Sequence, residues 1–225
     1  MGRLLTLGIL GACACAAIAS PSDAQSTGSI SGTITTSAKG LAPVRVTIDQ
    51  KICGAELPDH AIVVDGQGHL ANAVVILTGV KRAALSDTTV LNEKCHFAPR
   101  VQIARPKSNL RTTSKDPILH TTNAQLATGK TLFNVALPIA GLTISKPIGG
   151  AGTIRLSCNT HPWMRGWVIV TDEAAAVTGA DGRFSLDNIP PGTYELRVWH
   201  ESLKAAPQKV IVVAGKPTEI SLRMQ

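Results

Sequence analysis

Short runs of alternating hydrophobic and polar residues recur along the chain, separated by turn residues. The alternation is clearest at residues 28–35 and 44–48, where it predicts strands with one face turned to a core. No segment keeps a helical period over several turns, because proline and glycine recur too often. Further apolar runs predict strands at residues 61–64, 73–77, 98–104, 131–136, 142–145, 153–157 and 166–171.

Two stretches between these runs differ from the rest. Asp65-Gly66-Gln67-Gly68 predicts the tight turn of a hairpin between the apolar runs on either side of it. Residues 105–130 are polar and predict mostly loop around a short strand that carries His120. Many short strands with turns between them are typical of a β-sandwich or barrel, so we expect an all-β protein.

The composition indicates which residue types form the core and which kinds of partner the protein can bind. The chain has 225 residues, enough for one large or two modest domains. Hydrophobic residues make up 44% of it and aromatic residues only 3%, so Val, Ile, Leu and Ala must supply most of the core. The formal charge is +7, but the charges are scattered and form no basic patch interleaved with aromatics. We therefore expect no nucleic-acid partner, and the charge fits an acidic protein partner or an anionic membrane surface.

Residues 1–24 have the pattern of a secretory signal peptide. Arg3 gives a positive start, residues 4–18 are apolar, and small residues before Gln25 offer a cleavage site. We therefore expect a periplasmic or secreted protein. Leu10-Gly11-Ala12-Cys13 also resembles a bacterial lipoprotein box, and a lipidated Cys13 would associate the protein with a membrane. The apolar stretch before Cys13 is short for such a signal, so we favour ordinary cleavage.

The cysteine count separates a structural pair from a single thiol. Two of the five cysteines lie in the predicted signal peptide, which leaves Cys53, Cys95 and Cys158. An exported protein with three cysteines is expected to pair two and to keep one free for a reason. Cys53 and Cys95 lie outside any motif, so we predict a disulfide between them. Cys158 is the remaining thiol.

A run of soft metal ligands contains that thiol. Cys158, His161 and Met164 form a C-x2-H-x2-M pattern directly after a predicted strand. A thiolate, an imidazole and a thioether suit copper, and a second imidazole completes the His2Cys plane of a blue-copper site. His120, on its own predicted strand, is placed to supply that imidazole. A buried cysteine, a packed methionine and a surface histidine give the same pattern without a metal, but the odd cysteine favours copper.

A strand, this ligand loop and a second strand, in a β-rich chain, resemble the cupredoxin family of plastocyanin-like proteins. The resemblance covers roughly residues 28–172 and implies a Greek-key β-sandwich with one mononuclear type 1 copper ion. His120, Cys158 and His161 would be equatorial ligands and Met164 the axial one. The chain departs from plastocyanins in two places: Met164 follows His161 by three residues instead of five, and His120 is followed by Thr121 instead of Asn. Met164 is therefore the least secure ligand, and the reduction potential is left open.

The C-terminal part resembles a different family. Asp181-Gly182-Arg183-Phe184 and Pro190-Pro191-Gly192-Thr193-Tyr194 match the two turns of the carboxypeptidase regulatory-like, or transthyretin-like, β-sandwich. The resemblance implies no peptidase activity. The glycine-rich strand that usually opens this module is missing after residue 172, so strand 166–171 is a candidate for sharing between modules. We predict a signal peptide at 1–24, a cupredoxin-like domain at 25–172 and the regulatory-like module at 173–225.

These observations favour a function without excluding others. The leading hypothesis is an exported type 1 copper protein that carries one electron to a redox protein partner by transient contact. Hydrolase and nucleotide-binding motifs are missing and no small-molecule substrate is evident, so we expect no enzyme. The alternatives are a non-redox binding or adhesion module, and a periplasmic copper carrier that uses the same ligands.

Several residues near the motif have open roles. Trp163 and Trp167 bracket the ligand loop and are candidates for shielding the metal or for docking, with a core role as the alternative. His96 beside Cys95 is a weaker metal candidate, because a disulfide would occupy that cysteine. His200 is more simply a strand-end histidine packed beside Trp199.

Overall fold

The computed structural model describes Gly2, residues 26–83 and residues 87–225, so the predicted signal peptide, Gly2 apart, lies outside the described residues. Within them the regular secondary structure is almost entirely β-strand, with one short helix, which confirms the all-β prediction. No helix of this part is long and apolar enough to cross a membrane. The elements are β1 (Gly28–Thr36), β2 (Val44–Arg45), α1 (Gln50–Cys53), β3 (Glu56–Leu57), β4 (Val74–Lys81), β5 (Thr88–Glu93), β6 (His96–Ala98), β7 (Val101–Ala104), β8 (Asn109–Ser114), β9 (His120–Leu126), β10 (Thr131–Leu137), β11 (Thr143–Pro147), β12 (Gly152–Ser157), β13 (Arg165–Val170), β14 (Glu173–Val177), β15 (Arg183–Ile189), β16 (Gly192–Trp199), β17 (Gln208–Val212) and β18 (Pro217–Met224).

Residues 87–172, here called the central unit, form two sheets. One has the strand order β10-β9-β12-β13-β7 and the other the order β11-β8-β5-β6. Alternating residues of both sheets meet in one core, as in a β-sandwich. That core contains Val90, Leu110, Ala124, Leu156 and Val168, all fully buried.

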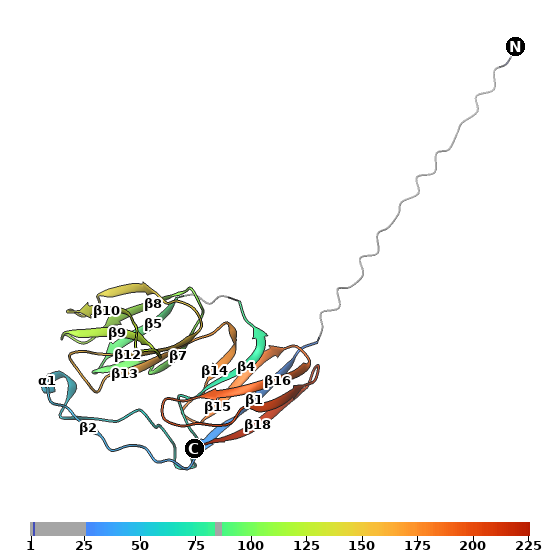
Figure 1. Cartoon of the computed structure of the whole chain (residues 1–225), viewed down its shortest axis with the longest axis horizontal. Coiled ribbons are helices and arrows are strands. Elements are labelled where there is room, and N and C mark those ends of the chain that lie inside the picture. Colours follow the sequence, from blue (N-terminus) through green and yellow to red (C-terminus); the bar gives the residue numbers. More distant parts are fainter. Residues whose placement is uncertain (1, 3–25, 84–86) are drawn as a thin grey trace.

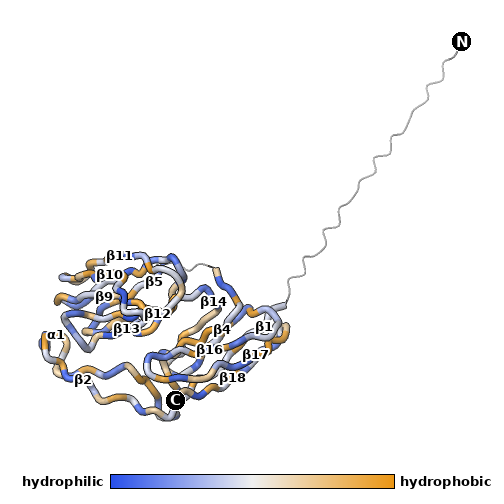
Figure 2. The backbone as a smooth tube through the Cα atoms, viewed as in Figure 1, coloured by the Kyte–Doolittle hydropathy of each residue, from blue (hydrophilic) through white to orange (hydrophobic). Residues whose placement is uncertain are grey.

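The second unit, here called the terminal unit, combines the two ends of the described chain. One sheet has the order β15-β1-β18 and the other the order β14-β4-β16-β17. Their shared core contains Ile30, Leu77, Phe184, Leu196 and Leu222. Hydrophobic and hydrophilic residues alternate along the strands of both units, as a sandwich with one solvated face requires (Figure 2).

The domain boundary predicted at residue 172 does not match the way in which the strands pair into sheets. Residues 28–36 and 74–81, expected in the first domain, pair with strands that follow residue 172. Strand β1 carries Gly28 and Gly32 and lies between β15 and β18, where the sequence after residue 172 offers no glycine-rich strand. Strand β13 pairs only with β12 and β7, so it is not shared between the units. The central unit thus interrupts the terminal unit (Figure 1).

Residues 37–68, here called the bridging segment, run from the terminal unit across to the far end of the central unit (Figure 1). The segment contains α1 and the small β2–β3 pair. Its Val46, Cys53 and Leu57 are buried in the core of the central unit. A disulfide between Cys53 and Cys95 fastens it there, as predicted from the cysteine count.

Some local predictions were wrong. The Asp65–Gly68 turn forms, but residues 61–64 make only an isolated bridge to Leu70, and β4 pairs with β14 and β16 instead of closing a hairpin. Residues 105–130 contain the full strands β8 and β9. Their polar Thr112 and Thr122 side chains are buried and hydrogen-bond to each other at 2.6 Å, and such pairing cannot be seen in a hydropathy pattern.

Several contacts join the units, and a hydrophobic cluster lies between them that includes Val74, Val101 and Ile169. Trp167 of β13 packs edge-on against Trp199 of β16, with 5.4 Å between ring centroids. Arg100 donates two hydrogen bonds to the Glu201 carboxylate, at 2.7 and 2.9 Å. This ion pair is mostly buried, so its geometry restrains how the units sit against each other.

Strand β1 supplies the first testable prediction. A Cβ at Gly32 would collide with the carbonyl oxygen of Ile220 on the neighbouring β18, so G32A is expected to cost about 1–3 kcal/mol or more in free energy of unfolding. Chemical denaturation measures it. G150A is the matched control, because Gly150 has no neighbouring atoms within 4 Å. Equal stability of the two variants would contradict the placement of β1 between β15 and β18.

Candidate metal centre

Three of the four predicted ligands meet at one end of the central unit. His120 is the first residue of β9, Cys158 follows the last residue of β12, and His161 lies in the loop before β13. Because β9 and β12 are antiparallel, with Asn123 opposite Ser157, the start of one strand and the end of the other share an edge. One donor atom from each of the three residues lies within 4.8 Å of the others. All three side chains are buried.

The two imidazole rings are oriented by carboxylates. His120 Nε2 hydrogen-bonds to Asp116 Oδ2 at 2.9 Å, and His161 Nε2 hydrogen-bonds to Asp49 Oδ2 at 3.0 Å. A carboxylate accepts, so each Nε2 carries a hydrogen, and in the neutral ring each Nδ1 keeps its lone pair. His161 Nδ1 lies 3.6 Å from Cys158 Sγ, and His120 Nδ1 is buried without a partner among the described residues.

The Cys158 sulfur lies in an environment that favours the thiolate. The Thr121 backbone N–H donates to Sγ at 3.3 Å, and the Thr121 hydroxyl lies 3.7 Å away. Burial by itself raises the pKa of Cys158, but the neighbouring His120 ring, the Thr121 amide and a backbone hydrogen bond in the His161 loop lower it to about 6. Burial also lowers the pKa of His120, and the neighbouring Cys158 sulfur and Asp116 carboxylate outweigh this and raise it.

The loop that carries the ligands is held at both ends. Asn159 donates its backbone N–H to the Thr121 hydroxyl at 2.7 Å, and Met164 donates its N–H to the His161 carbonyl at 3.0 Å. Thr121 therefore occupies the position where an asparagine was expected and fastens the loop directly. Met164 is buried in the same core as Cys158, and its role as an axial ligand stays a prediction.

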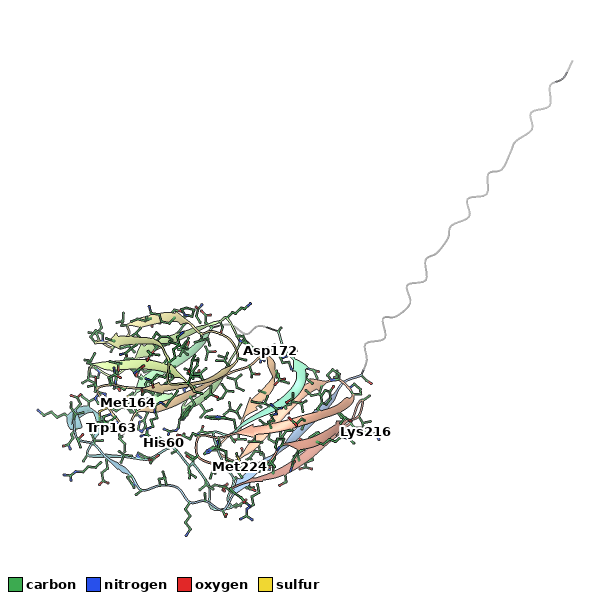
Figure 3. All side chains as sticks on the ribbon, in the orientation of Figure 1. His60, Trp163, Met164, Asp172, Lys216 and Met224 are labelled. Carbon is green, nitrogen blue, oxygen red and sulfur yellow. A yellow bond between two sulfur atoms is a disulfide. The ribbon has the colours of Figure 1, made fainter. Side chains whose placement is uncertain are left out.

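The two tryptophans that bracket the loop lie in different places. The Trp163 ring lies 5.2 Å from the His161 ring, at the end of the central unit next to α1 (Figure 3). It packs against the core that contains Cys158, which suits shielding of the site. Trp167 instead packs against Trp199 between the two units. Docking roles for both remain predictions.

A second group of donor atoms is a weaker metal candidate. Cys95, Asp116 and His120 also lie within 4.8 Å of one another. Cys95 is in the disulfide, so its sulfur is not a thiolate, and Asp116 already accepts the N–H groups of Lys94 and Cys95. This group is better described as the hydrogen-bonded support of His120.

The other histidines are engaged in local structure. His96 Nδ1 hydrogen-bonds to the Lys94 carbonyl at 2.7 Å. His200 is buried at a strand end, and its Nδ1 accepts the N–H groups of Ser202 and Leu203. Both arrangements agree with the ordinary structural roles expected for these residues.

Sequence reasoning missed the two carboxylates that orient the histidines. Asp116 lies four residues before His120, and that short spacing was an available signal. Asp49 is 112 residues from His161 and reaches it only because the bridging segment folds back over the site. No local pattern marks such a contact.

The thiolate supplies a prediction about pH. Since the pKa of Cys158 is about 6 in the folded protein and about 8.5 in an unfolded chain, the unfolded state binds more protons between these values. Cys158 therefore contributes a free energy of unfolding that rises with pH over this window and is lost as pH falls through 6, while the raised pKa of His120 contributes in the opposite direction above pH 6.5. Denaturation at several pH values measures the slope. C158S should lack this contribution, and an identical slope in C158S would contradict the low pKa.

Comparisons with known proteins return the two families that the motifs resemble. The model of the family described as carboxypeptidase regulatory-like domain matches residues 152–225, less than half of the chain. No curated protein sequence matches the chain. Solved structures with partial similarity include a purple cupredoxin from Nitrosopumilus maritimus, at 22% identity and a TM-score of 0.34, covering 38% of this chain and 100% of that one.

Two further structures show the same level of likeness. The M98A mutant of amicyanin in its Cu(I) form is 15% identical with a TM-score of 0.33, covering 43% of this chain and 98% of that one. The copper-containing nitrite reductase from Thermus scotoductus SA-01 is 18% identical with a TM-score of 0.32, over 42% of this chain and 24% of that enzyme. The chain is all-β, and its residues 152–225 match the model of the carboxypeptidase regulatory-like domain.

Proposed function

We propose that the protein is an exported copper protein with one mononuclear type 1 site, and that it carries single electrons. The observation that carries this proposal is the buried convergence of His120, Cys158 and His161, with their donor atoms within 4.8 Å. A thiolate with two imidazoles is a donor set that suits copper. When bound, copper cycles between Cu(I) and Cu(II) and so supplies the one-electron chemistry.

The unpaired Nδ1 atom of His120 supports the fit of a metal. A buried nitrogen lone pair without a hydrogen-bond donor is costly, and a cation would satisfy it. The Cys158 thiolate and the Asp49 and Asp116 carboxylates place negative charge around the two imidazoles, so a cation is also favoured electrostatically. Met164 would complete the site as a weak axial donor.

The protein residues have separate tasks in this proposal. His120 and His161 hold their rings through carboxylate hydrogen bonds, and the Thr121 amide stabilises the thiolate charge on Cys158. Trp163 and the surrounding core exclude water. A donor set fixed by hydrogen bonds and packing changes little between oxidation states, which favours fast electron transfer.

The proposal includes the compartment of the protein and the kind of redox partner that it contacts. The Cys53–Cys95 disulfide supports an oxidising compartment such as the periplasm or the exterior, where such bonds persist. The formal charge of +7 favours a redox protein with an acidic surface, met through a small and transient interface. We assign no catalytic step and no substrate to the site.

Copper uptake gives the direct test. One equivalent of Cu(II) added to residues 25–225 should produce an intense thiolate-to-copper absorption band and a narrow copper hyperfine splitting in EPR. C158S should lose the band, because its hydroxyl is not a charged soft donor. A colourless protein that binds no copper would favour a non-redox binding module. Tight Cu(I) binding without a reversible voltammetric wave would favour a copper carrier.

The axial position has its own prediction. M164L should keep the thiolate band, because His120, Cys158 and His161 remain, and should shift the reduction potential upward, because a thioether donor to Cu(II) is lost. M224L is the matched control, since Met224 is buried in the core of the terminal unit. Protein-film voltammetry compares the three proteins. The same potential in M164L and the unmodified protein would remove Met164 from the ligand set.

A further inference from the structure

The bridging segment reaches into the candidate metal centre. His161 is fully buried, and its outer nitrogen Nε2 meets Asp49 of this segment instead of solvent. His120 is held in the same way by Asp116. We propose that Asp49 and Asp116 are positioning residues that turn both Nδ1 atoms toward Cys158, and that the Cys53–Cys95 disulfide anchors them. This inference deepens the proposed copper function and rests on it for its metal measurements.

The local geometry of Asp49 supports a role at His161. Asp49 is the N-cap residue of α1, and its carbonyl accepts the N–H groups of Ile52 and Cys53, both at 2.9 Å. An N-cap aspartate ordinarily turns its carboxylate back to the helix, but this one makes no such hydrogen bond. Its backbone has φ = 54°, a left-handed conformation that few residues other than glycine adopt readily. The carboxylate instead reaches His161 and separates it from solvent.

Asp116 is held more firmly. It is buried, and its two carboxylate oxygens accept the N–H groups of Lys94 and Cys95 at 2.8 and 2.9 Å. The oxygen that accepts the Cys95 N–H also accepts the His120 Nε2–H. Both oxygens of this carboxylate are thereby held by the turn between β5 and β6. His120 cannot rotate without breaking this network.

The disulfide joins the supports of the two histidines. Cys53 ends the helical turn that Asp49 begins, and Cys95 donates its N–H to Asp116. A single S–S bond therefore links the segment that holds His161 to the turn that holds His120. Both ends of the bridging segment lead into the terminal unit, so this bond is its covalent attachment to the central unit. Loss of the bond should release Asp49 first, because Asp116 lies within the central unit.

The first measurement needs no metal. At pH 8, two-bond ¹⁵N–¹H NMR of the copper-free protein should show the hydrogen of His161 on Nε2, as the contact with Asp49 requires. In D49A this preference should weaken or reverse. A hydrogen on Nδ1 in the unmodified protein would overturn the inference, whether or not the protein binds copper.

The second measurement compares charge-matched variants in the copper protein. D49N should bind Cu(II) about 10- to 100-fold more weakly and shift the reduction potential upward, because a carboxylate on the far nitrogen makes the imidazole a stronger donor. E56Q is the control: Glu56 lies exposed on the same segment and contacts no ligand, so it removes the same charge. Equal effects of D49N and E56Q would overturn the positioning role and leave only a general charge effect.

A third variant tests the anchor. The double substitution Cys53→Ser and Cys95→Ser should lower copper affinity in the same direction as D49N, and D49N added to it should have little further effect. Full additivity would overturn the role of the disulfide. If the unmodified protein binds no copper but His161 keeps its hydrogen on Nε2, the proposed function fails and the positioning inference stands. If copper binds and D49N behaves as E56Q does, the positioning inference fails and the function stands.

Discussion

The pairing of β1 with β15 and β18 is the constraint on which the rest of the structure depends. Because β1 runs parallel to β18, the two strands cannot be joined by a hairpin, and nearly the whole described chain lies between them. The central unit is therefore an insertion with both ends fixed in the terminal unit. The bridging segment must leave the terminal unit after β1 and return before β4, and this route takes it across the candidate metal centre.

Hydrogen bonds at the candidate metal centre compensate for the burial of polar side chains. A thiol and two imidazoles in a core are costly unless each polar atom has a partner. Here the Asp116 and Asp49 carboxylates satisfy the Nε2 atoms of His120 and His161. The Thr121 amide donates to the Cys158 sulfur. Among these atoms His120 Nδ1 has no hydrogen-bond partner in the part of the chain that the structure describes, and a bound cation would satisfy its lone pair.

The units also meet beside the site. Trp163 contacts His161, while Trp167 on the next strand packs against Trp199 of the terminal unit. The Arg100–Glu201 ion pair restrains the same interface. Trp163, in the loop before β13, thus lies against the candidate metal centre, and Trp167, within β13, lies against the neighbouring unit.

The sequence by itself determined the all-β class, the Cys53–Cys95 pair and the residues that converge at one end of a sheet. These follow from alternation, cysteine counting and ligand spacing, which are local properties of the chain. Only the tertiary structure decided that β1 and β4 belong with the last strands, and that Asp49 holds His161. Strand partners and long-range contacts depend on register and on competition among many similar strands, and no local pattern records that competition.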